Sequence, residues 1–460
     1  MSLAIDCATM YIKNFYHTVA PDKFPQPILQ PGRPLSCETE GSITFLINQI
    51  ITDSSGQAYR IIDLIGSGSY GSVFKCQLIS NPEIFLAIKV IKNQPQYMQS
   101  GLNEVSMLSQ VSQLRNHPGL DFILLPITTF ELNGHMCIVS PLLQHSLFEG
   151  IYNNQSLSSL LDSIRNIMRN LLLALDAVHS CGIIHGDVKT DNILKINDTS
   201  DDICLIDFGS ASNTNRVGKY FQSRFYRSPE VILSLPYTTQ IDMWSAGCVA
   251  AELFLDFAPF SCDNEYDLIH TIVALIGQIP DDFVASSPKW QHFYNYTPMG
   301  FNLKSNAIRV VLDRHLNKSI FIERGPMNLA QLVMTRFEPQ SREEYESVVV
   351  FSSFLHGLLS IDPNSRMTAR QALMHPFINT SSPLNFNINT QPIIHPINNF
   401  SIQQQQQFQF QQQQQLMQMQ MQIQQQQHMQ INAPILPPNI PSMPFLSPIN
   451  SRCPSFIEMF

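Results

Sequence analysis

The chain has 460 residues and a formal net charge of -9, with 44% hydrophobic but only 14% charged residues. This length excludes a small stapled scaffold and leaves room for roughly two or three lobes or domains. The acidic charge disfavours a general nucleic-acid or anionic-membrane surface, because such surfaces gather Lys and Arg.

Cysteine usage and apolar stretches bear on the compartment. The nine cysteines are scattered singly and form no CxxC pair, which is typical of thiols in a reducing compartment. The N-terminal stretch carries Asp6 and no apolar core of signal-peptide type. The most apolar long stretch, residues 241–260, contains Asp242, Glu252 and Asp256, which are expensive in hydrocarbon. We expect no secretion, no membrane span and a cytoplasmic or nuclear location.

In chain order, an arm precedes a small β-rich region. Residues 1–42 mix Pro, Gln and Gly without a period and are interpreted as a flexible arm. Residues 43–51, ITFLINQII, are predicted to form a strand. Further on, four β-rich runs flank one helical stretch at residues 97–114: YRIIDLIG, GSVFKCQLI, IFLAIKVIK and HMCIVSPLL. Residues 43–144 are therefore predicted to form a small sheet with one helix.

Residues 145–380 are predicted to form a larger, mainly helical lobe. Apolar residues recur at three- and four-residue spacings in 158–180, and helical signals return at 344–360. Between them, residues 283–345 are interpreted as an irregular insertion because prolines interrupt them at Pro288, Pro298, Pro326 and Pro339.

Residues 381–460 are rich in Gln, Pro and Asn. Few core-forming side chains are available there to offset the backbone entropy lost on ordering, so the tail is predicted to be disordered. Two interpretations stay open, an uncharged spacer, which we favour, and an assembly or interaction segment.

The first chemical motif is Gly66-Ser67-Gly68-Ser69-Tyr70-Gly71-Ser72-Val73, between two β-rich runs. Glycines let the backbone approach a phosphate and present N–H groups to it. Alone, the pattern also fits a dinucleotide fold or an ordinary glycine hairpin. A strand is predicted to follow it, whereas the dinucleotide fingerprint opens a helix, so a phosphate-covering hairpin is favoured.

The second motif is Ala87-Ile88-Lys89 in an apolar strand, with Glu104 on the next helix. Glu104 shares a helical face with Met107, Leu108 and Val111, and an unpaired buried carboxylate is costly. Lys89 is the obvious partner, and such a pair would hold its ammonium on nucleotide phosphates. Taken singly, either charge could instead extend to solvent.

The third and fourth motifs are His185-Gly186-Asp187-Val188-Lys189-Thr190-Asp191-Asn192 and Asp207-Phe208-Gly209. Phosphoryl transfer needs a carboxylate to orient the hydroxyl, a cation at the γ-phosphate and oxygen ligands for Mg²⁺. Asp187 and Lys189 match the first two roles, and Asn192 and Asp207 match the third. Each motif could be a polar loop by itself, but four in this order make coincidence improbable.

These motifs resemble those of the eukaryotic protein kinase superfamily, over residues 59–378. KYFQSRFYRSPEVILSLPYTTQIDMWSAGCVAAELF is similar to the dual-specificity tyrosine-regulated kinases of the CMGC group, and LAIKVIKNQPQYMQSGLNEVSML to their Yak-type branch. The resemblance implies an α+β, bilobal kinase-like fold that binds ATP and Mg²⁺. The implied ATP-binding residues are Ile65, Gly66, Ser67, Gly68, Ser69, Tyr70, Gly71, Ser72, Val73, Ala87, Lys89, Ser140, Pro141, Leu143 and Leu194.

The resemblance also implies control elements. Tyr220 would be phosphorylated in cis and clamped by Arg224 and Arg227, while mature activity goes to Ser and Thr. Glu230 would pair with Arg366 in a structural ion pair.

The chain departs from the kinase pattern at several positions. Gly186 stands where most kinases have Arg, Thr190-Asp191 replaces a usual Pro-Glu pair, and Gly218 replaces a second tyrosine. Ser140 stands where the family usually has a bulky aromatic at the entrance to the pocket behind adenine.

The leading interpretation is an ATP- and Mg²⁺-dependent protein kinase with proline-directed Ser/Thr substrates suggested by group resemblance. We expect a monomeric kinase domain without nucleic-acid or membrane partners. The alternatives are a pseudokinase scaffold and an interaction protein acting through the Gln-rich tail.

Overall fold

The computed structural model describes residues 34–35, 41–149, 156–213, 221–304, 309–313, 318–322, 328–337 and 339–380. All of them belong to the first of two units, residues 1–384. Most of the predicted N-terminal arm, the Gln-rich tail, Gly218 and Tyr220 lie outside the described residues.

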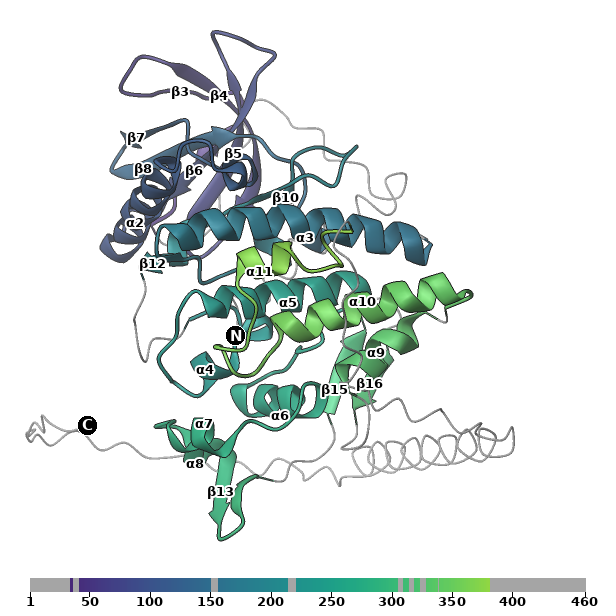
Figure 1. Ribbon diagram of the computed structural model, residues 1–460. Helices are drawn as coiled ribbons and strands as arrows, with labels where there is room; N and C mark the ends of the chain where they lie inside the picture. Colours follow the sequence, from purple (N-terminus) through teal and green to yellow (C-terminus); the bar gives the residue numbers. More distant parts are fainter. Residues whose placement is uncertain are drawn as a thin grey trace, which may run out of the picture. The chain divides into compact units, whose positions relative to one another are not determined.

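An antiparallel sheet of six strands, counted over the described residues, forms the first lobe (Figure 1). Its order is β3-β4-β5-β6-β8-β7. The strands are β3 (Ile50–Thr52), β4 (Ala58–Ser67), β5 (Gly71–Leu78), β6 (Phe85–Ile91), β7 (Thr128–Leu132) and β8 (His135–Pro141). Alternate side chains, including Ile61, Phe74 and Ile88, build a buried core on one face.

Helix α2 (Pro95–Ser112) packs against β6 and β8, and Pro95 occupies its first turn, where the missing N–H is tolerated. The helix therefore begins two residues before the predicted start. β7 was not predicted, since its sequence TTFEL offers only a short run.

The single strand predicted at residues 43–51 was wrong. Residues 45–46 form β2 (Phe45–Leu46), which pairs with β1 (Pro34–Leu35), and β3 begins only at Ile50. Between them Asn48 adopts a left-handed conformation (φ 68°), which Asn tolerates better than most residues, and turns the chain.

The second lobe is built around α3 (Leu157–Ser180), which packs on α5 (Gln240–Leu255) and α11 (Ala369–Leu373), while α10 (Arg342–Leu358) lies along α5 (Figure 1). The Ser156 hydroxyl caps α3 by accepting a hydrogen bond from Ser159 N–H. The remaining regular elements near the site are β9 (Ile183–Ile184), β10 (Ile193–Lys195), β11 (Ile203–Leu205), β12 (Ser212–Asn213), α4 (Pro229–Ile232) and α6 (Glu265–Leu275). The predicted two-lobed α+β architecture is confirmed.

The interpretation of residues 283–345 as irregular was wrong. They contain short helices and two hairpins: α7 (Asp281–Ala285) leads into them, followed by α8 (Trp290–Phe293), β13 (Tyr294–Thr297), β14 (Gly300–Leu303), β15 (Arg309–Asp313), β16 (Lys318–Ile322) and α9 (Leu329–Arg336). Pro288 and Pro298 lie between elements, at the start of α8 and in the β13–β14 turn, so they delimit structure instead of preventing it.

The apolar stretch at residues 241–260 includes α5, whose side chains are buried in the core of the second lobe. Within the described ranges, no helix combines the length and the apolarity that a membrane span requires.

Candidate active site

The glycine motif forms the tight connection between β4 and β5. Gly68 N–H donates to Gly71 O at 2.9 Å, and Ser67 pairs with Ser72 across the hairpin. A Cβ added at Gly71 would lie 2.2 Å from the carbonyl oxygen of Val90 on β6, so only glycine fits there. A strand follows the motif, as predicted, and the turn has the form of a hairpin lid.

Lys89, on β6, lies between two carboxylates. Its Nζ is 2.8 Å from Glu104 Oε2 on α2 and 2.9 Å from Asp207 Oδ1 after β11. Burial alone would lower the pKa of Lys89, but Asp207 and Glu104 raise it above its ordinary value. The ammonium therefore stays charged, and the two side chains do not extend separately into solvent.

The two acids differ in their electrostatics. Burial raises the pKa of Glu104 even though Lys89 opposes the shift. At Asp207 burial acts in the same direction, but Lys89 outweighs it and lowers the pKa. Asp207 is thus held ionised, as a metal ligand must be.

A side chain of α5, Asp242, binds the backbone of the loop that carries Asp187. Asp242 accepts backbone hydrogen bonds from His185 N and Gly186 N, both at 2.8 Å, and lies 3.0 Å from His179 Nε2. The Asp242 side chain is fully buried. An acid within so apolar a stretch of sequence indicates a buried carboxylate that needs hydrogen-bond partners. Asp242 therefore fixes the backbone just before Asp187.

Three side chains converge on the Asp187 carboxylate. Lys189 Nζ lies 2.9 Å and Asn192 Nδ2 3.0 Å from Oδ2, and the Ser223 hydroxyl donates to Oδ1 at 2.6 Å. Burial would lower the pKa of Lys189, but Asp187 raises it, so the cation persists beside the acid. Sequence reasoning missed Ser223, for which spacing alone offers no signal.

Asn192 and Asp207 lie at the same end of the hairpin that β10 and β11 form. Ile193 pairs with Leu205, and Ile206 N–H donates to Asn192 O at 3.0 Å, so the residues flanking the two strands share one end. Asn192 uses its amide nitrogen on Asp187, which leaves the amide oxygen for a cation.

This donor set fits Mg²⁺. Mg²⁺ takes one or two protein oxygens and completes its octahedron with water and phosphate, unlike a cage built wholly from protein. Over the described part of the chain, no group of three or more His, Cys, Asp or Glu side chains gathers that could hold a metal alone. Asn192 and Asp207 are the residues that would hold a phosphate-bound Mg²⁺, each through a side-chain oxygen.

The residues expected around adenine lie on β6, β8 and β10, on the chain that follows β8 and on the glycine hairpin. Ser140 pairs with Ala87 across β8 and β6, and both are buried. Pro141 is the last residue of β8, and Leu143 follows it. Leu194 lies on β10, with Ile65 and Val73 on the glycine hairpin.

The substituted positions Thr190 and Asp191 form a 3-10 turn with Asn192. The Thr190 hydroxyl is buried 3.0 Å from the Tyr226 hydroxyl, which itself bonds Glu252. Thr190 thereby joins the loop to a polar network in the second lobe, and the loop keeps Lys189 and Asn192 on Asp187.

The two arginines expected to clamp a phosphate, Arg224 and Arg227, have different partners in the structure. Arg224 donates to the carbonyl of Asp263, whereas Arg227, with a side chain only 1% exposed, bonds Glu265 at 2.7 Å. Arg227 also donates to the carbonyls of the two residues that precede Ser223. Arg227 therefore has a structural role that sequence reasoning did not anticipate.

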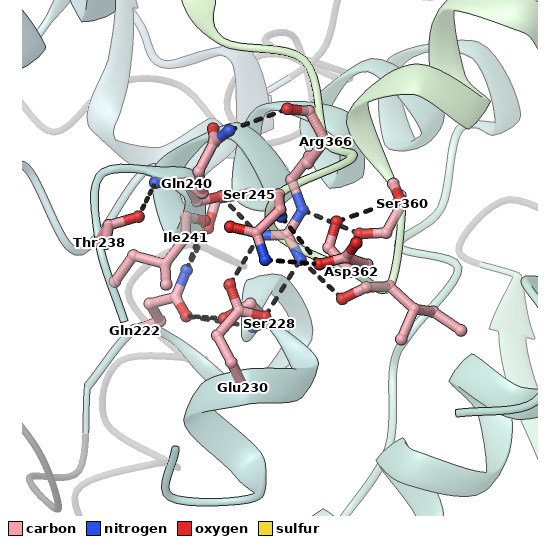
Figure 2. A network of polar contacts seen from close by, with 12 residues as sticks. Gln222, Ser228, Glu230, Thr238, Gln240, Ile241, Ser245, Ser360, Asp362 and Arg366 are labelled. Atoms are coloured by element: carbon pink, nitrogen blue, oxygen red, sulfur yellow. Dashed lines mark hydrogen bonds and ion pairs between the residues drawn. The ribbon is translucent and has the colours of Figure 1, made fainter. Parts of the chain in front are cut away.

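Glu230 and Arg366 are brought together in a buried, two-pronged ion pair, drawn in Figure 2. Arg366 NH1 lies 2.7 Å from Glu230 Oε1 and NH2 lies 3.1 Å from Oε2. The pair ties α4, which follows the segment carrying Ser223, to the loop before α11.

Comparison with known proteins identifies the family to which the chain belongs. Residues 59–378 match the family model described as protein kinase domain, so the chain belongs to the protein kinase family. It is 33% identical over 392 residues to the probable serine/threonine-protein kinase yakA of Dictyostelium discoideum. Identity is also 33% to serine/threonine-protein kinase ppk15 of Schizosaccharomyces pombe over 376 residues, and to the dual specificity protein kinase YAK1 homolog of Arabidopsis thaliana over 368.

These matches cover 78%, 76% and 74% of this chain. They cover 26%, 70% and 38% of the respective relatives, so two of the three are matched over less than half of their length. The predicted membership in the Yak-type kinases is confirmed at the level of the domain.

Proposed function

We propose that this chain transfers the γ-phosphoryl group of ATP to Ser and Thr hydroxyls of proteins. The observation that carries the proposal is the contact of the Ser223 hydroxyl with Asp187 at 2.6 Å, with Lys189 Nζ 3.1 Å from the same hydroxyl. A hydroxyl can thus approach the carboxylate as a phosphate acceptor would, next to a cation.

The roles of the residues follow from their contacts. Asp187 orients the attacking hydroxyl and accepts its proton, while Lys189 balances charge on the transferred group. Lys89, held by Glu104, presents its ammonium to the phosphates of ATP. Mg²⁺, when bound to Asn192 and Asp207, supplies positive charge that offsets charge developing on the phosphates.

The test is transfer of radiolabelled phosphate to a degenerate peptide library, comparing wild type with Asp187→Asn. Loss of a positioned base should lower kcat by about 10²–10⁴-fold. Asp198→Asn is the matched control, because Asp198 is an exposed acid in the connection between β10 and β11. Equal transfer by wild type and Asp187→Asn would favour the scaffold alternative instead.

We further propose a preference for proline directly after the phosphorylated residue. Gln222 precedes Ser223, has a positive φ of 64°, and its carbonyl accepts from Arg227 NH2 at 2.7 Å. That carbonyl is therefore turned away from a peptide lying on Asp187, and a substrate N–H there would lose its acceptor. Proline has no N–H to leave unsatisfied. Ser-Pro peptides should be phosphorylated faster than matched Ser-Ala peptides, and equal rates would contradict this.

We also propose cis phosphorylation of Tyr220, which lies outside the described residues. Its support is Arg224, whose Nε is buried and without a hydrogen-bond partner among the described residues, and so can serve an anionic group. Peptide mapping of active protein made in bacteria tests this, and an unmodified Tyr220 in that protein would refute it.

A further inference from the structure

Gly186 stands where most kinases carry arginine. The ring of Phe221 occupies the space into which a side chain at this position would extend. Gly186 has a φ of +78°, and a Cβ added there would lie 2.4 Å from both Cε1 and Cζ of Phe221. Carbon atoms in contact prefer separations of about 3.5–4.0 Å, so any side chain at this position would displace the ring. The glycine is needed for space as well as for its backbone conformation.

The Phe221 ring has a second contact. It stacks on Tyr237, with centroids 5.4 Å apart and an angle of 18° between the ring planes. Tyr237 belongs to a small buried apolar cluster that includes Ile184, next to the loop of Gly186. Phe221 thus packs against both the catalytic loop and the segment that follows α4.

The two residues that follow Phe221 connect it to the Asp187 carboxylate. The next residue, Gln222, is buried and donates to Ile241 O and Ser245 Oγ of α5 at 2.9 and 2.8 Å. Ser223 then bonds Asp187 Oδ1 through both its backbone N–H and its hydroxyl. Ser223 lies only two residues after Phe221, so a displacement of the Phe221 ring would be transmitted to the contact with Asp187.

We propose that Phe221 is a positioning residue whose ring, seated on Gly186, sets the placement of Ser223 and the peptide-binding segment against Asp187. An apolar contact between complementary residues, Gly186 and Phe221, thereby holds this segment where other kinases use arginine. The effect on transfer rests on the proposed kinase function, whereas the physical coupling of the two residues does not.

The test compares four full-length proteins: wild type, Gly186→Ala, Phe221→Leu and the double variant. Leucine lacks the Cε1 and Cζ atoms that the new methyl group would meet. Gly186→Ala should lower kcat/KM for peptide by up to about 10²-fold, the effect of misplacing a reacting group by about 1 Å. KM for ATP should stay within about twofold, since Lys89 and Asp207 are untouched. Phe221→Leu leaves a gap beside Gly186 and should itself lower kcat/KM, whereas in the double variant the new methyl group fills that gap, so most of the kcat/KM lost in Gly186→Ala should return.

Gly182→Ala is the matched control for backbone strain. Gly182 has a similar φ of +69°, but nothing lies within 4 Å of an added Cβ. It should therefore destabilise the protein through its backbone and leave kcat/KM for peptide nearly unchanged. If Gly182→Ala lowers kcat/KM as much as Gly186→Ala, or if the double variant is no better than Gly186→Ala, the proposal is wrong.

Thermal unfolding provides a readout that does not need activity. Gly186→Ala should lower Tm more than Gly182→Ala does, and the excess should vanish in the Phe221→Leu background. Should Gly186→Ala fail to fold, recovery of folded protein by the added Phe221→Leu change supports the coupling, and its absence overturns it. A wild type that transfers no phosphate would refute the proposed function alone, because the Tm comparison still decides the pair.

Discussion

Replacing Glu230 by glutamine removes one charge from the buried ion pair while preserving the size of the side chain. The side chains of Arg366 and Glu230 are 0% and 1% exposed, so water cannot replace the lost partner. Arg366 would keep its hydrogen bonds to the carbonyls of Gln240, Ser360 and Ile361, seen in part in Figure 2. Those carbonyls carry no net charge to balance the guanidinium.

The magnitude follows from the uncompensated charge. Removing one partner of a buried pair leaves the other without its counter-ion and costs about 3–5 kcal/mol. The new amide also directs N–H groups at a guanidinium that can only donate. Because whole domains are stable by about 5–15 kcal/mol, Glu230→Gln should remove a large part of the free energy of unfolding.

Urea-induced unfolding followed by circular dichroism measures this loss. The control is Glu346→Gln, which removes the partner of Arg342 on α10, where the side chains are 90% and 54% exposed. An exposed pair of this spacing contributes about 0.3–0.5 kcal/mol, so the urea midpoint of Glu346→Gln should hardly differ from that of the wild type. Similar shifts for the two variants would refute the reasoning that burial makes the Glu230 pair indispensable.

Two further predictions concern inhibitor access and pH. Ser140 is small and buried opposite Ala87, so it should leave space for ATP-competitive inhibitors with a bulky group. Ser140→Phe should remove the sensitivity to such inhibitors while ATP still binds. Equal inhibition of both proteins would count against this prediction. Burial lowers the pKa of His375 from 6.5 to about 4, so the unfolded chain binds the proton more readily between these values. Tm should therefore fall as pH drops from 6.5 to 4, and a His375→Gln variant with an equally steep profile would exclude this origin.

Local sequence determined most of the secondary structure. The β-rich runs became β4, β5, β6 and β8, and the three- and four-residue periodicity became α3 and α10, because side-chain alternation and helical spacing are properties of the chain itself. The exceptions were the turn at Asn48 and the hairpins within residues 283–345. Short paired strands gain their stability from partners, so their own residues carry weak signals.

The site divides in the same way. The residues that bear the chemistry, such as Lys89, Asp187 and Asp207, could be found by spacing, because phosphate, proton and metal chemistry demand particular functional groups. Which atoms they meet was decided only by folding. Ser223 reaches Asp187 from 36 positions away, and the Phe221 ring fills the space above Gly186. Contacts of this kind depend on how distant segments of the second lobe pack against one another, and no local pattern of residues encodes that packing.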